Sequence, residues 1–242
     1  MVCRARLPLD NGEPLEVVCK RAAPRGLFKR IRNSLRTSRA MLTWKRGNAL
    51  LNRRIPTARP LAVLQKRRFG CLLDSLVITE YVEHARDLDT VLTVDMREMP
   101  DPRQRRLKTQ IIESLVTLFR RLEDCSFTHR DLKAPNVIVQ WQRQSREPPR
   151  VTLVDLDGIR RARRTRHAAR MRAVMRLNVS LDHCRRVTRT DRLRFLMRYL
   201  DRLGRPARQY KPIWRELAAR SERKRRQRAR QQEKMLKKYG RF

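Results

Sequence analysis

The chain has 242 residues, of which 61 are Lys or Arg and 24 are Asp or Glu, so its formal net charge is +37 at pH 7. Its 40% of apolar residues can build a sizeable core, in one large domain or two closely joined lobes. The five cysteines are dispersed without a Cys-x-x-Cys pair, which argues against a disulfide framework or a zinc site. With no apolar run near the roughly 18 residues of a membrane span, and no signal peptide in the first ten residues, we expect a cytoplasmic protein.

The positive charge predicts an anionic partner, which could be nucleic acid, an anionic membrane surface or an acidic acceptor molecule. Charge alone does not choose among these three. Arg far outnumbers Lys, so genomic base composition accounts for part of the excess.

The first eighty residues read mainly as strands. The turn signal Asp10-Asn11-Gly12-Glu13 between two short apolar stretches predicts a hairpin, and the two prolines within 55–60 interrupt a basic stretch with helical spacing. The predicted elements are strands at 2–7, 15–20, 61–65 and 70–81 and a helix with a break at 27–54.

The remainder reads as mainly helical. A short helix is predicted at 87–92 and a longer one from Pro102, with Leu107, Ile111, Leu115, Leu118, Phe119 and Leu122 on one face. Further predicted elements are strands at 137–141 and 151–154, a helix at 193–203 with Leu193, Leu196, Met197 and Leu200 facing inward, and a basic helix or frayed tail at 216–238. We therefore expect an N-lobe at 1–82, a C-lobe at 83–215 and a basic tail at 216–242.

The string His129-Arg130-Asp131-Leu132-Lys133-Ala134-Pro135-Asn136 carries the strongest functional signal. A strand pattern ending in Asp155 follows it, 19 residues after Asn136. These are the residue types that transfer a phosphoryl group from ATP to a hydroxyl. Asp131 is predicted to accept the hydroxyl proton, Lys133 to lie near the transferred phosphate, and Asn136 and Asp155 to hold Mg²⁺ through hard oxygen ligands.

Each residue of this string, taken alone, could also have a purely structural role. Asp131 alone could be a helix cap and Asn136 a turn residue, but the complete string with its downstream Asp disfavours that interpretation. His129 is expected to order the loop rather than to act as the base.

The catalytic string resembles the protein-kinase-like fold, and other strings most resemble the bacterial lipopolysaccharide kinases, the Kdo/WaaP family. The likeness covers roughly residues 15–200. It is carried by the strings at 18–21, 38–40, 55–62, 78–83, 129–132, 153–157 and 190–196.

The resemblance implies an α+β, protein-kinase-like two-lobed fold with a mainly helical C-lobe. It implies a kinase that uses ATP and Mg²⁺ to phosphorylate a sugar of the lipopolysaccharide core, working at the inner face of the membrane. It also implies that Lys20 contacts the α- and β-phosphates, that the backbone at Glu80 and Val82 receives the adenine, and that Thr79 stands at the back of that pocket.

The chain departs from the family pattern in three ways. The first strand and Gly-rich loop of the N-lobe are absent from the sequence pattern, so we expect a reduced sheet. No Asp or Glu occurs from Ala22 through Leu73, so Lys20 needs another partner: Asp155, the nucleotide or Asn48. Asp157 stands where the usual motif has Gly, and no Ala-Pro-Glu follows.

Three functions remain open at this point. The leading one is a kinase for an anionic glycolipid or phosphorylated sugar, with the arginine run 160–176 facing the acceptor. A protein Ser/Thr kinase is the second, and the missing Ala-Pro-Glu counts against it. The third is an inactive kinase fold that binds nucleic acid, which the intact motif and an aromatic content of 5% oppose. The tail at 216–238 is either solvated or attached to an anionic membrane surface or RNA.

Overall fold

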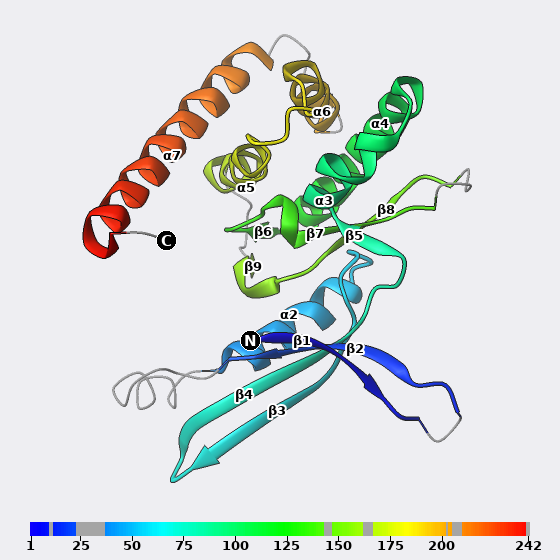
Figure 1. Cartoon of the computed structure of the whole chain (residues 1–242), viewed down its shortest axis with the longest axis vertical. Helices are drawn as coiled ribbons and strands as arrows, with labels where there is room; N and C mark the ends of the chain where they lie inside the picture. Colours follow the sequence, from blue (N-terminus) through cyan, green and yellow to red (C-terminus); the bar gives the residue numbers. More distant parts are fainter. Residues whose placement is uncertain are drawn as a thin grey trace.

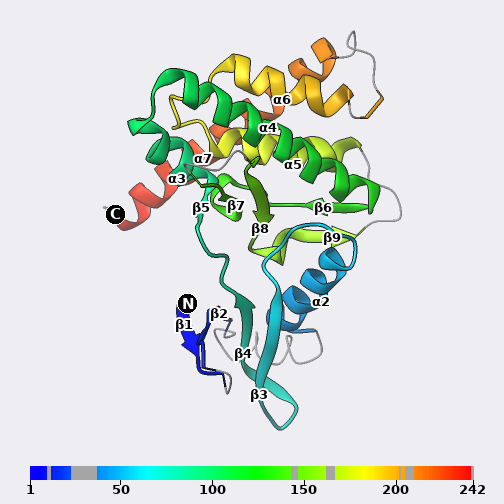
Figure 2. The same ribbon diagram turned by 90° about the vertical axis from the view of Figure 1, so that its right-hand side faces the viewer.

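The computed structural model describes residues 1–9, 12–22, 37–142, 147–161, 167–201, 203–204 and 210–240. They form two lobes, a smaller one built on a β-sheet and a larger one that is mainly helical (Figure 1). The chain passes from the sheet lobe to the helical lobe after strand β4, as the side view also shows (Figure 2). The expected α+β two-lobed fold is therefore present.

The sheet of the smaller lobe has four antiparallel strands in the order β1-β2-β4-β3. Its strands are β1 (Val2–Leu7), β2 (Leu15–Arg21), β3 (Pro60–Arg68) and β4 (Cys71–Glu80). The predicted hairpin is confirmed, since β1 pairs with β2 in a register that places Cys3 opposite Cys19. Its apolar side chains include Val17 and Val77, which are 0% and 2% exposed.

Helix α2 (Arg39–Leu51) packs on this sheet. Ser38 caps it, because its hydroxyl accepts a hydrogen bond from the backbone N–H of Met41 at 3.1 Å. Gly47 lets the helix approach the start of β3, where a Cβ would lie 2.3 Å from Cγ of Pro60. The helix ends at Leu51, three residues before the predicted end, and most of the predicted part before it, 27–36, lies outside the described residues.

The elements predicted for the helical lobe are present, with ends shifted by a few residues, and helix α5 lies where the sequence predicted only an arginine run. Its strands are β5 (Ala85–Asp87), β6 (Phe127–His129), β7 (Val137–Gln140), β8 (Arg150–Leu153) and β9 (Ile159–Arg161), in two small sheets ordered β5-β7-β8 and β6-β9. Its helices are α3 (Leu88–Thr93), α4 (Asp101–Asp124), α5 (His167–Ser180), α6 (Arg189–Asp201) and α7 (Tyr210–Tyr239), with 3₁₀ turns at η1 (Asp95–Glu98), η2 (Ala134–Asn136) and η3 (Leu156–Gly158).

Helix α4 forms the centre of the core of this lobe. All six residues predicted on its apolar face are buried: Leu107, Ile111, Leu115, Leu118, Phe119 and Leu122. The 3.6-residue period of apolar side chains identified this face from the sequence because one side of the helix packs against the lobe.

Helix α6 begins earlier than predicted and buries a different set of side chains. Met197, expected to face inward, is 42% exposed, whereas Tyr199 is 0% exposed. Tyr199 and Leu200 follow Leu196 by three and four residues, so these three side chains share one buried face of the helix. Met197 lies outside that face. The hydroxyl of Tyr199 donates to Glu123 of α4, so this polar side chain is satisfied where it is buried.

Helix α7 runs along the flank of the helical lobe, beside α5 (Figures 1 and 2). Ile213 and Leu217, both at most 6% exposed, anchor its first half. The boundary expected at residue 216 therefore falls inside helix α7, between the buried residues Ile213 and Leu217. No helix in the described ranges is both long and apolar enough to cross a bilayer.

The segment between α2 and β3 is bonded to the helical lobe. Thr57 forms a parallel bridge with Leu153, and its hydroxyl donates to the carbonyl of Leu153 at 2.8 Å. The N–H of Leu153 donates to the carbonyl of Pro56 at 3.0 Å. The smaller lobe is thus tied to the end of β8, two residues before Asp155.

Candidate active site

The catalytic loop is built around a buried imidazole. His129 ends β6 and is 1% exposed, and its Nδ1 accepts a hydrogen bond from the backbone N–H of Asp131 at 3.2 Å. Burial lowers the pKa of His129 and outweighs the opposing effect of Asp155 and Asp131. A neutral ring with Nδ1 as an acceptor fits this contact. The expectation that His129 orders the loop is confirmed.

The Asp131 carboxylate lies between two cations. Its Oδ2 is 2.9 Å from Nζ of Lys133, and its Oδ1 is 2.9 Å from a guanidinium nitrogen of Arg176 on α5. Burial raises the pKa of Asp131, but Lys133 and Arg176 lower it by more, so its pKa is below the usual range. The buried Oδ1 has no aligned hydrogen bond from any described residue, so this ionised oxygen can accept one.

Asn136 and Asp155 come together because their backbone segments are bonded. The side-chain amide of Asn136 donates to the carbonyl of Asp131 at 3.1 Å. The backbone carbonyl of Asn136 accepts a hydrogen bond from the backbone N–H of Val154 at 3.0 Å. Asp155 follows with φ 57° and ψ 64°, a left-handed conformation that is uncommon for residues other than glycine. This sharp turn ends the extended run of β8 at the carboxylate of Asp155.

Lys20 of β2 reaches across to this turn. Its ammonium forms an ion pair with Asp155, and Oδ2 of Asp157 lies 3.8 Å away. Of the three partners suggested for Lys20 in the absence of a helix Glu, Asp155 is the one that pairs with it here. Oδ1 of Asp157 accepts a hydrogen bond from the hydroxyl of Thr43 at 3.0 Å, and Arg46 donates to the Asp157 carbonyl at 3.0 Å. Helix α2 therefore contacts the Lys20 site through Asp157.

Asn48 does not take the role suggested for it. Its side-chain amide donates to the carbonyl of Trp44 in its own helix at 3.0 Å. The residues that sequence reasoning missed are Thr43 and Arg46. One signal in the sequence could have pointed to them. Asp157 adds a carboxylate where the usual motif has Gly, and helix α2 has no acid, so a polar residue of α2 could be expected to contact Asp157.

Gly158 is a third residue that sequence reasoning passed over. A Cβ there would lie 2.6 Å from Cε1 and 2.7 Å from Nδ1 of His129. Its carbonyl accepts from the backbone N–H of Arg130 at 2.9 Å. The close-approach glycine thus lies one position after Asp157 and packs directly on the imidazole.

The residues expected around the adenine lie at the end of β4. Thr79 pairs with Val18, two residues from Lys20, and its hydroxyl donates to the Val18 carbonyl at 3.4 Å. The N–H of Glu80 donates to the carbonyl of Arg59 at 2.8 Å, and Val82 lies two residues beyond that strand end. Thr79 and Glu80 therefore lie on β4, the strand that pairs directly with the Lys20 strand β2.

Both ends of the arginine run 160–176 contact the catalytic cluster. Arg160 donates to the carbonyl of Asp157 at 3.3 Å, and Arg176 pairs with Asp131. Residues 162–166, in the middle of the run, lie outside the described residues. The run expected to face the acceptor therefore touches the predicted catalytic residues at both of its described ends.

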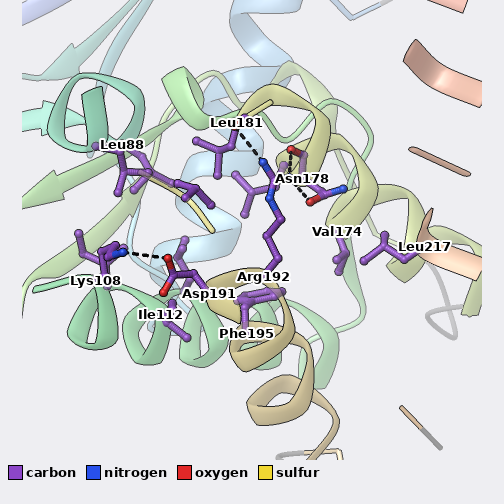
Figure 3. A pocket seen from close by; sticks show the side chains of 15 residues that line it. Leu88, Lys108, Ile112, Val174, Asn178, Leu181, Asp191, Arg192, Phe195 and Leu217 are labelled. Atoms are coloured by element: carbon purple, nitrogen blue, oxygen red, sulfur yellow. Dashed lines mark hydrogen bonds and ion pairs between the residues drawn. The ribbon is translucent and has the colours of Figure 1, made fainter. Parts of the chain in front are cut away.

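An apolar pocket of about 80 Å³ lies within the helical lobe, away from this cluster. Figure 3 shows its lining side chains, among them an ion pair between Lys108 and Asp191 at 2.9 Å. Arg192 bonds the carbonyl of Asn178 at 2.9 Å at another part of the wall. None of the eight predicted site residues lines this pocket.

The donor atoms present fit a magnesium ion shared with a nucleotide. Mg²⁺ usually binds one or two carboxylates together with phosphate oxygens, and Asp155 and Asn136 offer one carboxylate and one amide oxygen from adjoining segments. Within the described ranges, no group of three His, Cys, Asp or Glu side chains could hold a metal without such help.

A solved structure described as WaaP in complex with acyl carrier protein resembles this chain with a TM-score of 0.62 and 21% identity. The alignment covers 91% of this chain and 82% of that chain. At this identity the likeness shows the fold alone, which is the protein-kinase-like two-lobed architecture expected from the sequence.

Two relatives named 3-deoxy-D-manno-octulosonic acid kinase come from Haemophilus influenzae (strain 86-028NP) and Actinobacillus succinogenes. They are 25% and 30% identical over 126 and 125 residues, which is 52% and 51% of this chain. The matches cover 47% and 46% of the relatives, so the chain spans about half the length of the curated relatives it matches. A family model, lipopolysaccharide kinase (Kdo/WaaP) family, matches residues 21–199. With most of its length matched by that model, the chain belongs to the lipopolysaccharide kinase (Kdo/WaaP) family.

Proposed function

We propose that this chain is an ATP- and magnesium-dependent kinase that transfers the γ-phosphate to a sugar hydroxyl of a glycolipid of the lipopolysaccharide core type. The observation that carries the proposal is the bonded cluster of Asp131, Asn136, Asp155 and Lys20, which joins the two lobes. Membership of the family supports the reaction class, and the name of the relatives supports an acidic sugar as the acceptor.

The sheet lobe, residues 1–82, would bind the nucleotide. The backbone at Glu80 and Val82 receives the adenine, with Thr79 behind it, and Lys20 contacts the α- and β-phosphates. Asn136 and Asp155 would hold Mg²⁺, which neutralises phosphate charge when bound. Lys20 then exchanges its Asp155 partner for phosphate oxygens.

The helical lobe, residues 83–215, would carry out the transfer. Lys133 moves from Asp131 to the γ-phosphate, and Oδ1 of Asp131 receives the proton of the acceptor hydroxyl. The new bond joins the acceptor oxygen to the γ-phosphorus, the bond from that phosphorus to the bridging oxygen breaks, and ADP leaves. A carboxylate with a lowered pKa is a weak base, which suffices because this transfer depends mainly on positioning and electrostatics.

Two substitutions test the assignment. Asp131→Ala is expected to keep magnesium-ATP binding and to lower phosphoryl transfer by about 10²- to 10⁴-fold, because it removes the base. Asp155→Ala is expected to weaken stabilisation by magnesium-ATP in a thermal-shift titration. Asp124→Ala, at an exposed carboxylate outside the cluster, is the control and should change neither quantity. Retained turnover in Asp131→Ala would remove the base assignment, and equal stabilisation of Asp155→Ala and the parent would remove the metal assignment.

The acceptor class requires its own experiment. Radiolabelled ATP should label purified lipopolysaccharide rather than a mixed protein substrate, and the reverse result would favour a protein Ser/Thr kinase. A salt-dependent gel shift without binding of magnesium-nucleotide would favour the inactive, nucleic-acid-binding alternative.

We further propose that the chain works in the cytoplasm at the inner membrane face, as a peripheral protein. The support is the C-terminal part of α7, where exposed lysines and arginines surround Met235 and Leu236, which are 41% and 52% exposed. Sedimentation with anionic vesicles, lost in high salt, is the expected result. Equal binding to neutral vesicles would contradict an electrostatic attachment.

A further inference from the structure

The end of helix α5 connects the catalytic loop to helix α7. On one side, the hydroxyl of Ser180 accepts a hydrogen bond from the backbone N–H of Ala134, next to Lys133, at 2.9 Å. On the other side, the carbonyl of Val179 accepts from the guanidinium of Arg228 on α7 at 3.2 Å. Helix α7 is therefore held against the element that supports the catalytic loop.

One face of α7 points toward this junction. Ser221 is 1% exposed and its hydroxyl accepts from Asn178 of α5 at 2.9 Å. Lys224 and Arg228 follow Ser221 by three and seven residues, so the helical period places them on the same face. Both are half-buried, whereas the neighbouring Arg226 is exposed.

The cations on this face have no acidic partner of their own. Lys224 lies within electrostatic range of Arg176, Arg228 and Asp131. Burial lowers the pKa of Lys224, and repulsion from Arg176 and Arg228 adds to that effect. Among the described residues, no carboxylate lies within 4 Å of Lys224 or Arg228, because Asp182 and Glu222 are paired with other arginines of α7.

The single negative charge of Asp131 is therefore exceeded by the positive charges of Lys133, Arg176 and Lys224 around it. It already pairs with Lys133 at 2.9 Å and with Arg176 at 2.9 Å. Half-buried cations that repel one another cost free energy unless an anion joins them, and a guanidinium can bind a carboxylate or phosphate through two parallel hydrogen bonds.

We propose that Arg176, Lys224 and Arg228 form an oxyanion subsite for the acceptor, which binds a carboxylate or phosphate group of the sugar beside the reacting hydroxyl. Arg176 is adjacent to Oδ1 of Asp131, the oxygen that takes the hydroxyl proton, so an anion bound there orients the hydroxyl toward the base. The inference rests on the proposed function and adds residues of α7, which lies beyond the matched range 21–199.

Arg176 also links acceptor binding to the base. An acceptor anion competes with Asp131 for this guanidinium, and so holds the acceptor against the carboxylate. A neutral acceptor would leave the Arg176–Asp131 pair intact and would react more slowly.

The test compares two double variants of the full chain that each remove two positive charges from α7 at the same spacing. Lys224→Ala/Arg228→Ala removes the proposed subsite, and Arg226→Ala/Arg230→Ala is the matched control on an exposed face. Acceptors are 3-deoxy-D-manno-octulosonic acid and its methyl ester, which lacks the carboxylate charge. Inorganic phosphate binding, measured by calorimetry without nucleotide, gives a readout that does not require turnover.

The subsite variant should raise KM for the acid by about 10- to 100-fold, which is the range expected for lost hydrogen bonds between charged groups. The magnesium-ATP affinity of the subsite variant and its KM for the ester should stay within about twofold of the parent. The same two quantities of the control variant should also stay within about twofold. Phosphate should bind the parent and the control more tightly than the subsite variant.

The outcomes separate the two proposals. If the parent transfers no phosphate but its phosphate binding is lost in the subsite variant, the kinase proposal fails and the anion subsite stands. If the subsite variant and the control bind phosphate and the acid equally, or if the ester is affected as strongly as the acid, the subsite is refuted while the kinase proposal stands.

Discussion

The contact between Gly158 and His129 supports a quantitative prediction for Gly158→Ala. The added Cβ would lie 2.6 Å from Cε1 of the imidazole, where an ordinary contact begins near 3.4 Å. The φ of Gly158 is not positive, so backbone strain is not the cause. His129 is 1% exposed and cannot withdraw into solvent. We expect the free energy of unfolding to fall by about 1–3 kcal/mol, the usual cost of overpacking a core.

A double-mutant cycle isolates this contact. Urea denaturation would be measured for Gly158→Ala, His129→Ala and the double variant. Removing the imidazole removes the atoms that the new methyl group meets, so the double variant should be more stable than the sum of the single effects predicts, by about 1 kcal/mol or more. Additivity within about 0.5 kcal/mol would refute the steric argument. Transfer activity should also fall in Gly158→Ala, since the displaced ring no longer accepts from the N–H of Asp131.

Three other predictions follow from the same contacts. Lys108→Met should lower the free energy of unfolding by about 1–3 kcal/mol, because the nearly buried Asp191 loses the closer of two ion-pair partners and keeps Arg194 at 3.2 Å; an unchanged urea midpoint would contradict this. Thr43→Val should raise KM for ATP by about two- to tenfold, since Asp157 loses the hydroxyl that positions it beside Lys20, and an unchanged KM would exclude that role. Burial keeps the pKa of His129 below its ordinary value near 6.5, so the unfolded chain binds this proton more readily. Stability should therefore decline as pH falls below about 6.5, and His129→Gln should remove this component from urea midpoints measured between about pH 5 and 8.

The negative charge of Asp131 is compensated by two neighbouring cations before any substrate binds. Lys133 and Arg176 neutralise the carboxylate, and each is released by one of the two proposed substrates, the nucleotide for Lys133 and the anionic acceptor for Arg176.

The sequence by itself determined the features that depend on local spacing. The order and types of residues from His129 to Asn136, with Asp155 downstream, identified the catalytic loop because each chemical role needs a particular side chain at a short, fixed separation. The apolar period of α4 and the turn between β1 and β2 were equally readable, since helical and hairpin geometry repeat over a few residues. The absence of any acid from Ala22 through Leu73 showed that Lys20 needs another partner and left Asp155 as one of three candidates.

Only the tertiary structure decided which distant side chains meet. Thr43 and Asp157 are 114 residues apart, and no periodicity connects them. Met197 was expected to face inward but is exposed, because the phase of α6 is set by its packing on α4 and α7 and not by its own composition. Helix α7 reads in sequence as a basic helix or frayed tail, either solvated or attached to an anionic partner. In the structure Ile213, Leu217 and Ser221 are buried and fix its rotation, so that half-buried Lys224 and Arg228 lie on the face toward α5. A local pattern specifies which face of an element is apolar, but the packing of the whole lobe specifies what that face and its charged neighbours touch.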